Sequence, residues 1–184
     1  KGLYVALERP IETIICQLKK LGYENVIKNI VFVDAFAWRT GSESIAKYQL
    51  RNLSNLNELS VKLLSAVEEL GEGGFFLVDS LTNLANYNPE KDILHFFGVN
   101  SARLQKNGTT GIWVVEDGIH QPSFYHMLNH LADGILEMKL KDISSTSSRW
   151  IRSRALRGEP NIMDWFKVKI EREGLTLLGE CEKK

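Results

Sequence analysis

Residues 75–80, Phe-Phe-Leu-Val-Asp-Ser, decide the fold class of this 184-residue chain. Four consecutive apolar residues are followed at once by a carboxylate and a hydroxyl, with no polar residue interrupting the apolar run. A strand with this composition is typical of a sheet covered by helices on both faces, because neither face then meets water. The segment therefore predicts an interior strand of a parallel sheet with polar side chains at its carboxyl end.

Three similar apolar blocks stand on either side of this segment, at residues 2–7, 30–33 and 111–115. Stretches with helical spacing of apolar residues separate the blocks, at residues 11–21, 59–70 and 89–106. Pro10 suits the first turn of the first helix, and Asn57 is a candidate cap for the second. Strands and helices that alternate along the chain predict crossover connections and a mostly parallel sheet.

The last third of the chain has a different pattern. Short strand candidates occur there at residues 149–156, 164–170 and 175–178, with turn residues between them. Alternation of apolar and charged residues over 165–170 is typical of an antiparallel ribbon with one wet face. The sequence thus predicts an α/β fold: a three-layer core with a mostly parallel central sheet and a C-terminal antiparallel strand extension, in one domain over residues 1–184.

Composition narrows the classes of partner and compartment. Lys plus Arg and Asp plus Glu both total 23, so the net charge argues neither for nor against a polyanionic partner. Cys16 and Cys181 are the only cysteines and lack metal-ligand spacing, which indicates a reduced, cytoplasmic compartment. No apolar stretch approaches the roughly 20 residues of a membrane helix. We therefore expect no membrane partner.

Carboxylates follow four of the predicted strands. They are Glu8, Asp34, Asp79 and the pair Glu116 and Asp117. Ligands of doubly wound sheets bind beyond the carboxyl ends of the strands, and converging carboxylates suit a hydrated Mg²⁺. Taken singly, each acidic residue also fits a helix cap or a turn. Both interpretations stay open at this point.

Five segments resemble RecA/KaiC-like P-loop ATPases in the order of that family. They are residues 2–10 (the second core strand and its glutamate), 75–82 (the Walker B strand), 107–116 (the sensor strand), 131–137 (the segment after it) and 152–158 (the late strand ending in Arg-Gly). The resemblance covers nearly the whole chain. It implies a RecA-like core, ATP and Mg²⁺ as cofactors, and a homo-oligomer or a RecA-family partner.

The resemblance also implies roles for individual residues. Asp79 would hold Mg²⁺ through water, with Ser80 and Glu116 as further nucleotide-binding residues and Glu116 near the γ-phosphate. Glu8 would orient or deprotonate the attacking water. Arg157 would reach the nucleotide of a neighbouring subunit, where such an arginine stabilises transition-state charge.

Two departures from the family bear on the expected ATP hydrolysis. The chain contains no G-x-x-x-x-G-K-[ST] loop to bind the phosphates. That loop precedes the first segment in the family, so we expect further residues before Lys1, or another segment or chain that fills the gap. Ala155 stands where KaiC-like proteins commonly have a lysine, two positions before the arginine. We expect ATPase activity only if a phosphate-binding loop is present.

The alternative function is a nonhydrolysing RecA-fold regulatory or scaffold protein that binds a protein, a peptide or DNA. Four arginines at 149, 152, 154 and 157 could contact DNA phosphates, but they also fit an exposed edge strand protected by charge, which we favour. The predicted loop at residues 118–127 suits either a DNA or a protein partner.

Overall fold

A computed structural model describes residues 1–143, 146–159, 163–172 and 174–182. They form two compact units, Lys1–Met127 and Leu128–Lys184, each built around its own sheet. The single domain expected over residues 1–184 stays a prediction. The elements that begin in the first unit are β1 (Gly2–Ala6), α1 (Ile11–Lys20), α2 (Glu24–Ile27), β2 (Ile30–Asp34), η1 (Ala37–Arg39), β3 (Tyr48–Gln49), α3 (Leu56–Leu70), β4 (Gly74–Asp79), α4 (Leu81–Leu84), α5 (Glu90–Lys106), β5 (Thr109–Trp113) and α6 (Pro122–Leu131).

The first unit contains a five-stranded sheet in the order β3-β2-β1-β4-β5, with every neighbouring pair parallel. Each of the four longer strands overlaps one of the four apolar blocks, with β5 lying two residues earlier than its block, and the predicted parallel sheet is confirmed. β4, which carries residues 75–79, lies between β1 and β5. Its carboxyl end therefore has strand neighbours on both sides.

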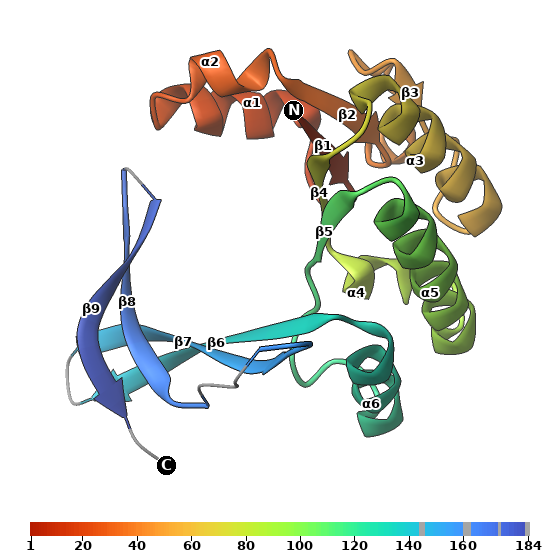
Figure 1. The fold of residues 1–184 in the computed structure, drawn as a ribbon. Coiled ribbons are helices and arrows are strands. Elements are labelled where there is room, and N and C mark those ends of the chain that lie inside the picture. Colours follow the sequence, from red (N-terminus) through yellow and green to blue (C-terminus); the bar gives the residue numbers. More distant parts are fainter. Residues whose placement is uncertain (144–145, 160–162, 173, 183–184) are drawn as a thin grey trace. The chain divides into compact units, whose positions relative to one another are not determined.

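Helices pack on the two faces of this sheet, and Figure 1 shows α1 on one side and α3 and α5 on the other. The core residues of α3 and α5 lie at helical spacing and are less than 5% exposed: Leu59, Leu63, Val67, Ile93, Phe96 and Phe97. On the opposite face, Ile11 and Ile14 of α1 pack with Ala6, Tyr4 and Phe32. Helix, sheet and helix form the three layers that the apolar blocks predict.

The coverage of the second face is incomplete. α1 packs over β1 and β2, whereas Phe75 on β4 is 64% exposed and Ile112 on β5 is 55% exposed. The prediction that helices cover both faces is therefore correct for β1 and β2 and wrong for β4 and β5. The reason is the reach of α1, whose apolar side chains contact the β1 and β2 half of the sheet.

The cap of α3 differs from the one expected. Asn55 precedes the helix, and its Oδ1 accepts a hydrogen bond from the Glu58 amide at 3.0 Å. Asn57 lies inside the first turn, where its backbone is helical and unsuited to an N-cap. The predicted cap was two residues too late because both asparagines precede the first apolar residue of the repeat at Leu59.

Gly111 on β5 allows close packing of an aromatic cluster. A Cβ atom at this position would lie 2.1 Å from Cε1 of Phe76, which is 1% exposed. The Phe76 ring meets the Trp113 ring edge-on, with the centroids 4.8 Å apart, so it has little room to move. We expect Gly111→Ala to lower the free energy of unfolding by about 1–3 kcal/mol, as overpacking of a core does.

Urea denaturation followed by circular dichroism tests this expectation. Thr110→Ala is the matched control, because Thr110 neighbours Gly111 on the same strand but is exposed. The control should cost less than about 1 kcal/mol. Equal stability of Gly111→Ala and the wild type would contradict the packing.

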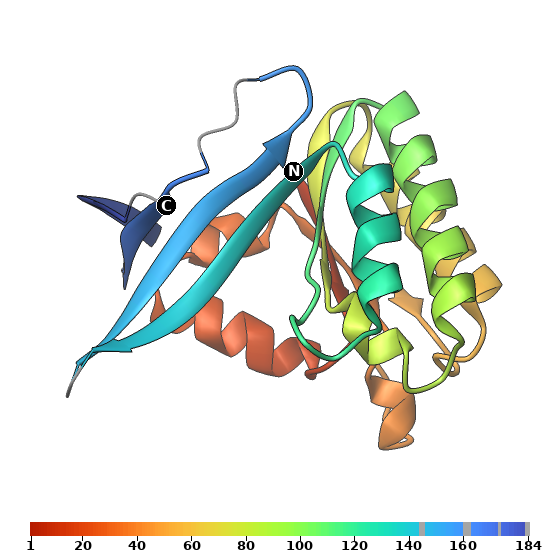
Figure 2. The same ribbon diagram turned by 90° about the horizontal axis from the view of Figure 1, so that it is seen from below.

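The second unit is a four-stranded antiparallel sheet in the order β6-β7-β8-β9. Its strands are β6 (Gly134–Ile143), β7 (Thr146–Leu156), β8 (Trp165–Glu171) and β9 (Gly174–Glu182). Figure 2 shows β6 and β7 side by side as a long ribbon. The α/β fold class and its C-terminal antiparallel extension are confirmed.

The structure differs from the sequence analysis in two places between residues 118 and 143. β6 was not predicted, although residues 136–141 alternate apolar and charged residues as residues 165–170 do. The predicted loop at 118–127 is wrong in its second half, since α6 begins at Pro122. Proline is favoured at the first position of a helix, which is the signal that the loop prediction overlooked.

No helix within the described ranges combines the length and the apolar character that crossing a membrane requires.

Candidate functional site

Glu8 and Asp79 lie at the same edge of the parallel sheet. Ala6 on β1 pairs with Asp79 on β4 in the parallel register, so Glu8 follows two residues past that edge. The Ser80 hydroxyl donates to Glu8 Oε1 at 2.8 Å, and the Leu7 amide donates to the Asp79 carbonyl at 3.3 Å. Ser80 is 1% exposed. The structure thus brings together three of the predicted site residues, Glu8, Asp79 and Ser80.

Tyr4 on β1 orients the Asp79 carboxylate. Its hydroxyl donates to Asp79 Oδ2 at 3.0 Å. Burial raises the pKa of Tyr4, and the neighbouring Asp79 carboxylate raises it further, so the hydroxyl stays protonated at neutral pH. Sequence reasoning missed Tyr4, because its place beside Asp79 depends on the register in which Tyr4 pairs with Leu77, on the same face of β4 as Asp79.

The donor groups at this edge restrict the kind of metal that fits. No group of three His, Cys, Asp or Glu side chains able to hold a metal ion occurs in the described part of the chain. Mg²⁺ keeps several waters and binds through one or two carboxylates together with substrate phosphates. The Asp79 carboxylate fits an ion that arrives with a nucleotide, and the surroundings do not fit a resident metal cage.

Asp34, at the end of β2, is used by the local backbone. It is 2% exposed, and its Oδ1 accepts from the amides of Phe36 at 2.8 Å and Ala37 at 2.9 Å. The Ser44 hydroxyl donates to Oδ2 at 2.5 Å. Of the two interpretations left open for the strand-end carboxylates, the one as a turn residue therefore applies to Asp34.

Glu116 follows β5 and is held by its backbone. Its amide donates to Thr82 Oγ1 at 3.0 Å, and its carbonyl accepts from the Tyr125 hydroxyl at 2.7 Å. Its side chain is exposed and lines a pocket shared with Glu8. The structure thus places the predicted residue Glu116 near Glu8, at the same end of the sheet.

The pocket has a volume of about 580 Å³ and is lined only by residues of the first unit. The polar side chains that line it are those of Glu8, Glu90, Glu116, Asn83, Asn86, Asn88, Thr82 and His120. Neither lysine nor arginine stands among the lining residues that the structure describes. Asp79 is outside the lining, so the pocket does not contain its carboxylate.

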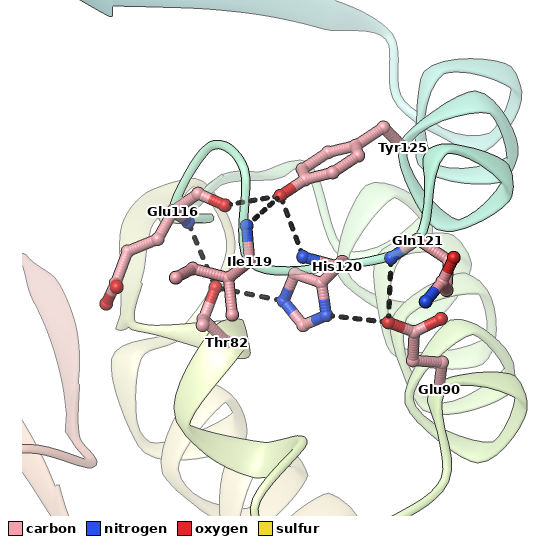
Figure 3. Close-up of polar contacts among 7 residues, drawn as sticks. All are labelled: Thr82, Glu90, Glu116, Ile119, His120, Gln121 and Tyr125. Atoms are coloured by element: carbon pink, nitrogen blue, oxygen red, sulfur yellow. Dashed lines mark hydrogen bonds and ion pairs between the residues drawn. The ribbon is translucent and has the colours of Figure 1, made fainter.

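His120 is a buried residue of the pocket lining, and Figure 3 shows its ring between Thr82 and Glu90. The His120 Nδ1 atom lies 3.0 Å from Glu90 Oε1, and its Nε2 atom lies 3.1 Å from Thr82 Oγ1. The ring also stacks on Phe124 with the centroids 4.1 Å apart. Sequence reasoning did not select Thr82, Glu90 or His120.

Arg157 belongs to the second unit. Its amide donates to the Asp133 carbonyl at 2.7 Å, and its guanidinium lies 3.0 Å from Asp133 Oδ1. The Arg157 side chain is 66% exposed. Its predicted role at the nucleotide of a neighbouring subunit stays a prediction.

The four arginines differ in their strand environment. β7 pairs with β8 only through residues 149–151, so the edge-strand interpretation is wrong for Arg149 and stays a prediction for Arg152 and Arg154, which are paired with β6 alone among the described strands. Both guanidinium groups pair with the Glu137 carboxylate, at 2.5 Å for Arg152 and 2.8 Å for Arg154. Although burial acts to raise the pKa of Glu137, the two arginines outweigh it and lower that pKa. Arg152, Arg154 and Glu137 thus form a cross-strand ion-pair network.

Comparison with known proteins gives a family and a fold. A family model described as "ATPase: KaiC" matches residues 1–182. No curated protein matches the chain.

Two solved structures from the archaeon Pyrococcus horikoshii are similar. The KaiC-like protein PH0186 of strain OT3 has a TM-score of 0.74 and 18% sequence identity, over 96% of this chain and 75% of its own. The uncharacterized protein PH0321, in complex with an unknown peptide, has a TM-score of 0.74 and 15% identity, over 99% of this chain and 80% of its own.

Proposed function

Since this chain belongs to the KaiC family of ATPases, we propose that it binds Mg²⁺-ATP at the sheet edge where Glu8 and Asp79 meet, and hydrolyses it within an oligomer. The observation that carries the proposal is the register of β1 and β4 together with the hydrogen bond between Ser80 and Glu8. These contacts hold a candidate base and a candidate metal ligand at one edge of a parallel sheet, where ligands of such folds bind.

Each residue at the edge has a part in the proposed reaction. Asp79, oriented by Tyr4, holds the metal through water. When bound, Mg²⁺ neutralises charge on the transferred phosphate. Ser80 fixes one oxygen of Glu8 by hydrogen bonding, and the carboxylate orients the attacking water and accepts its proton. Glu116, in the loop after β5, lies near the γ-phosphate.

The proposal requires a phosphate-binding loop that residues 1–184 do not encode. β5 lies at the edge of the sheet, and Phe75 and Ile112 are exposed on the face beside it. A strand added along β5, followed by a helix over this face, would bury both side chains and supply the loop. We place the loop on such a segment, from outside the 184 residues or from another chain.

Arg157 is proposed to act on the nucleotide of a neighbouring subunit. Its exposure supports this role, because the surface ion pair with Asp133 contributes little free energy and is readily exchanged for another anion. Ala155 stands where the family commonly has a lysine. Of these two positions, only Arg157 therefore supplies a positive charge.

ATP hydrolysis by a preparation that includes the phosphate-binding loop tests the proposal. We expect Mg²⁺-dependent phosphate release that rises with protein concentration as the oligomer forms. Neither binding nor hydrolysis of Mg²⁺-ATP by that preparation would overturn it.

A second candidate function is peptide binding in the 580 Å³ pocket. Three carboxylates line the pocket, at Glu8, Glu90 and Glu116, with no lysine or arginine beside them in the described lining. Such a surface attracts a cationic side chain. Peptide binding by the structural neighbour PH0321 supports a peptide partner, and we propose one with Lys or Arg.

Fluorescence anisotropy with a labelled Arg- and Lys-containing nonapeptide tests this second function. We expect salt-dependent binding that Glu116→Gln weakens about two- to fivefold, as loss of one partly exposed charge pair does. The matched control is Asp117→Asn, which removes the next carboxylate of the loop, outside the pocket. Equal affinity for a peptide with every Lys and Arg replaced by Gln would contradict the charge argument.

A further inference from the structure

We infer that Thr82, His120 and Glu90 form a positioning relay, which fixes the loop at residues 116–121 and through it the Glu116 carboxylate. The relay is a structural assignment about this chain. Its consequence for catalysis rests on the ATPase function proposed above.

The first step is the orientation of the His120 ring. Its side chain is 1% exposed, and Nδ1 faces Glu90 Oε1 at 3.0 Å. An ionised carboxylate only accepts hydrogen bonds, so Nδ1 carries the hydrogen. In the neutral imidazole, Nε2 is then the acceptor, and the Thr82 hydroxyl donates to it across 3.1 Å. Stacking on Phe124 fixes the plane of the ring.

The second step is the link between Thr82 and the loop. Thr82 Oγ1 accepts the Glu116 amide at 3.0 Å, and the Nδ1–H tautomer inferred for His120 requires the Thr82 hydroxyl to donate to Nε2. Thr82 stands three residues after Asp79, in the first turn of α4. One hydroxyl therefore ties the start of the loop to the segment that carries the proposed metal ligand.

The third step is the far end of the loop. Glu90 Oε1, which receives His120 Nδ1, also accepts the Gln121 amide at 3.2 Å. The Tyr125 hydroxyl accepts the amides of Ile119 and His120, both at 3.1 Å. Four of the loop amides are thus bound to side chains, so a single substitution can release one or two of them.

A hydroxyl, an imidazole and a carboxylate in this order also occur in hydrolase triads. Thr82 is 8% exposed, and its Oγ1 already accepts a backbone amide, which makes it a poor nucleophile. The contacts of the relay lead to the loop backbone. These two facts assign it positioning and not a covalent reaction.

Residue-resolved NMR on the full chain tests the relay. We expect the wild-type His120 ring to show the Nδ1–H tautomer in its ¹⁵N shifts. Thr82→Val, which keeps the shape and removes the hydroxyl, should speed hydrogen exchange of the Glu116 amide about 10-fold or more, because local openings govern such exchange. Thr82→Ser keeps the hydroxyl and should stay within about twofold of the wild type.

Tyr125→Phe is the matched control within the same loop. It should speed exchange at Ile119 and His120 while the tautomer of His120 is unchanged. An Nε2–H tautomer in the wild type, or equal Glu116 exchange in Thr82→Val and Thr82→Ser, would overturn the relay.

Steady-state ATP hydrolysis by a preparation with the phosphate-binding loop gives the catalytic consequence. Misplaced Glu116 should lower kcat of Thr82→Val about 10-fold with KM little changed, and Thr82→Ser should restore it. If the wild type hydrolyses no ATP, the proposed function fails, and the NMR result alone decides on the relay. Normal kcat in Thr82→Val with a released Glu116 amide would overturn the catalytic consequence.

Discussion

Glu8→Gln is expected to lower kcat for ATP hydrolysis about 100- to 1,000-fold while Mg²⁺-ATP still binds. The glutamine keeps an oxygen that accepts from the Ser80 hydroxyl, so the local structure is retained, but it cannot accept a proton from water. Loss of a positioned general base costs rates of this order. Phosphate release by a preparation with the phosphate-binding loop, combined with nucleotide binding by calorimetry, measures both effects.

Asp79→Asn should act differently, because it removes the charge that faces the metal. We expect weaker Mg²⁺-dependent binding of ATP together with lost hydrolysis. Glu12→Gln and Asp117→Asn are matched controls, since both residues are exposed acids of the first unit. Full activity of Glu8→Gln, or an equal loss of activity in the controls, would contradict the assigned roles.

The sequence predicts the longer strands of the sheet because the apolar composition of each strand depends on its surroundings in the fold. The four apolar residues at 75–78 are typical of a strand inside a parallel sheet, and β4 has strand neighbours on both sides, although Phe75 on one of its faces is exposed. β3 has only two residues, Tyr48 and Gln49, and its identity as a strand depends on its neighbour β2. A segment this short carries no periodicity of its own.

The candidate site likewise contains some residues that the sequence predicts and others that it does not. Glu8 and Asp79 could be predicted, because parallel strands bring their carboxyl ends to one edge. The contacts of His120 with Glu90 and Thr82 span 30 and 38 residues and depend on the path of two loops. No spacing of residues in the sequence predicts such a path, so these three residues are identified only from the structure.

The strand-end acids also show why a residue type alone does not assign a role. Asp34 and Asp79 both end parallel strands, and their sequence contexts are alike. Asp34 is followed by a turn whose amides point back at it, whereas Asp79 lies beside a tyrosine at a more open edge. The difference is made by the chain after each strand.

Asp34→Ala is accordingly expected to lower the free energy of unfolding of the first unit by about 3–5 kcal/mol. The substitution leaves two amides and a hydroxyl without their acceptor in a place where Asp34 is only 2% exposed. Each buried donor without a partner costs about 1–3 kcal/mol, and partial rehydration keeps the sum below the full total.

Asp34→Asn separates the hydrogen bonds from the charge. Its Oδ1 can still accept both amides, and its amide nitrogen can donate to the Ser44 oxygen in place of the present bond. We expect a loss of less than half that of Asp34→Ala, seen as a smaller fall of the urea midpoint at an unchanged slope. Loss of a structural hydrogen-bond acceptor should lower the free energy of unfolding. If Asp34→Ala proved as stable as the wild type but lost ATP hydrolysis, this assignment would be wrong, and Asp34 would belong to the catalytic edge.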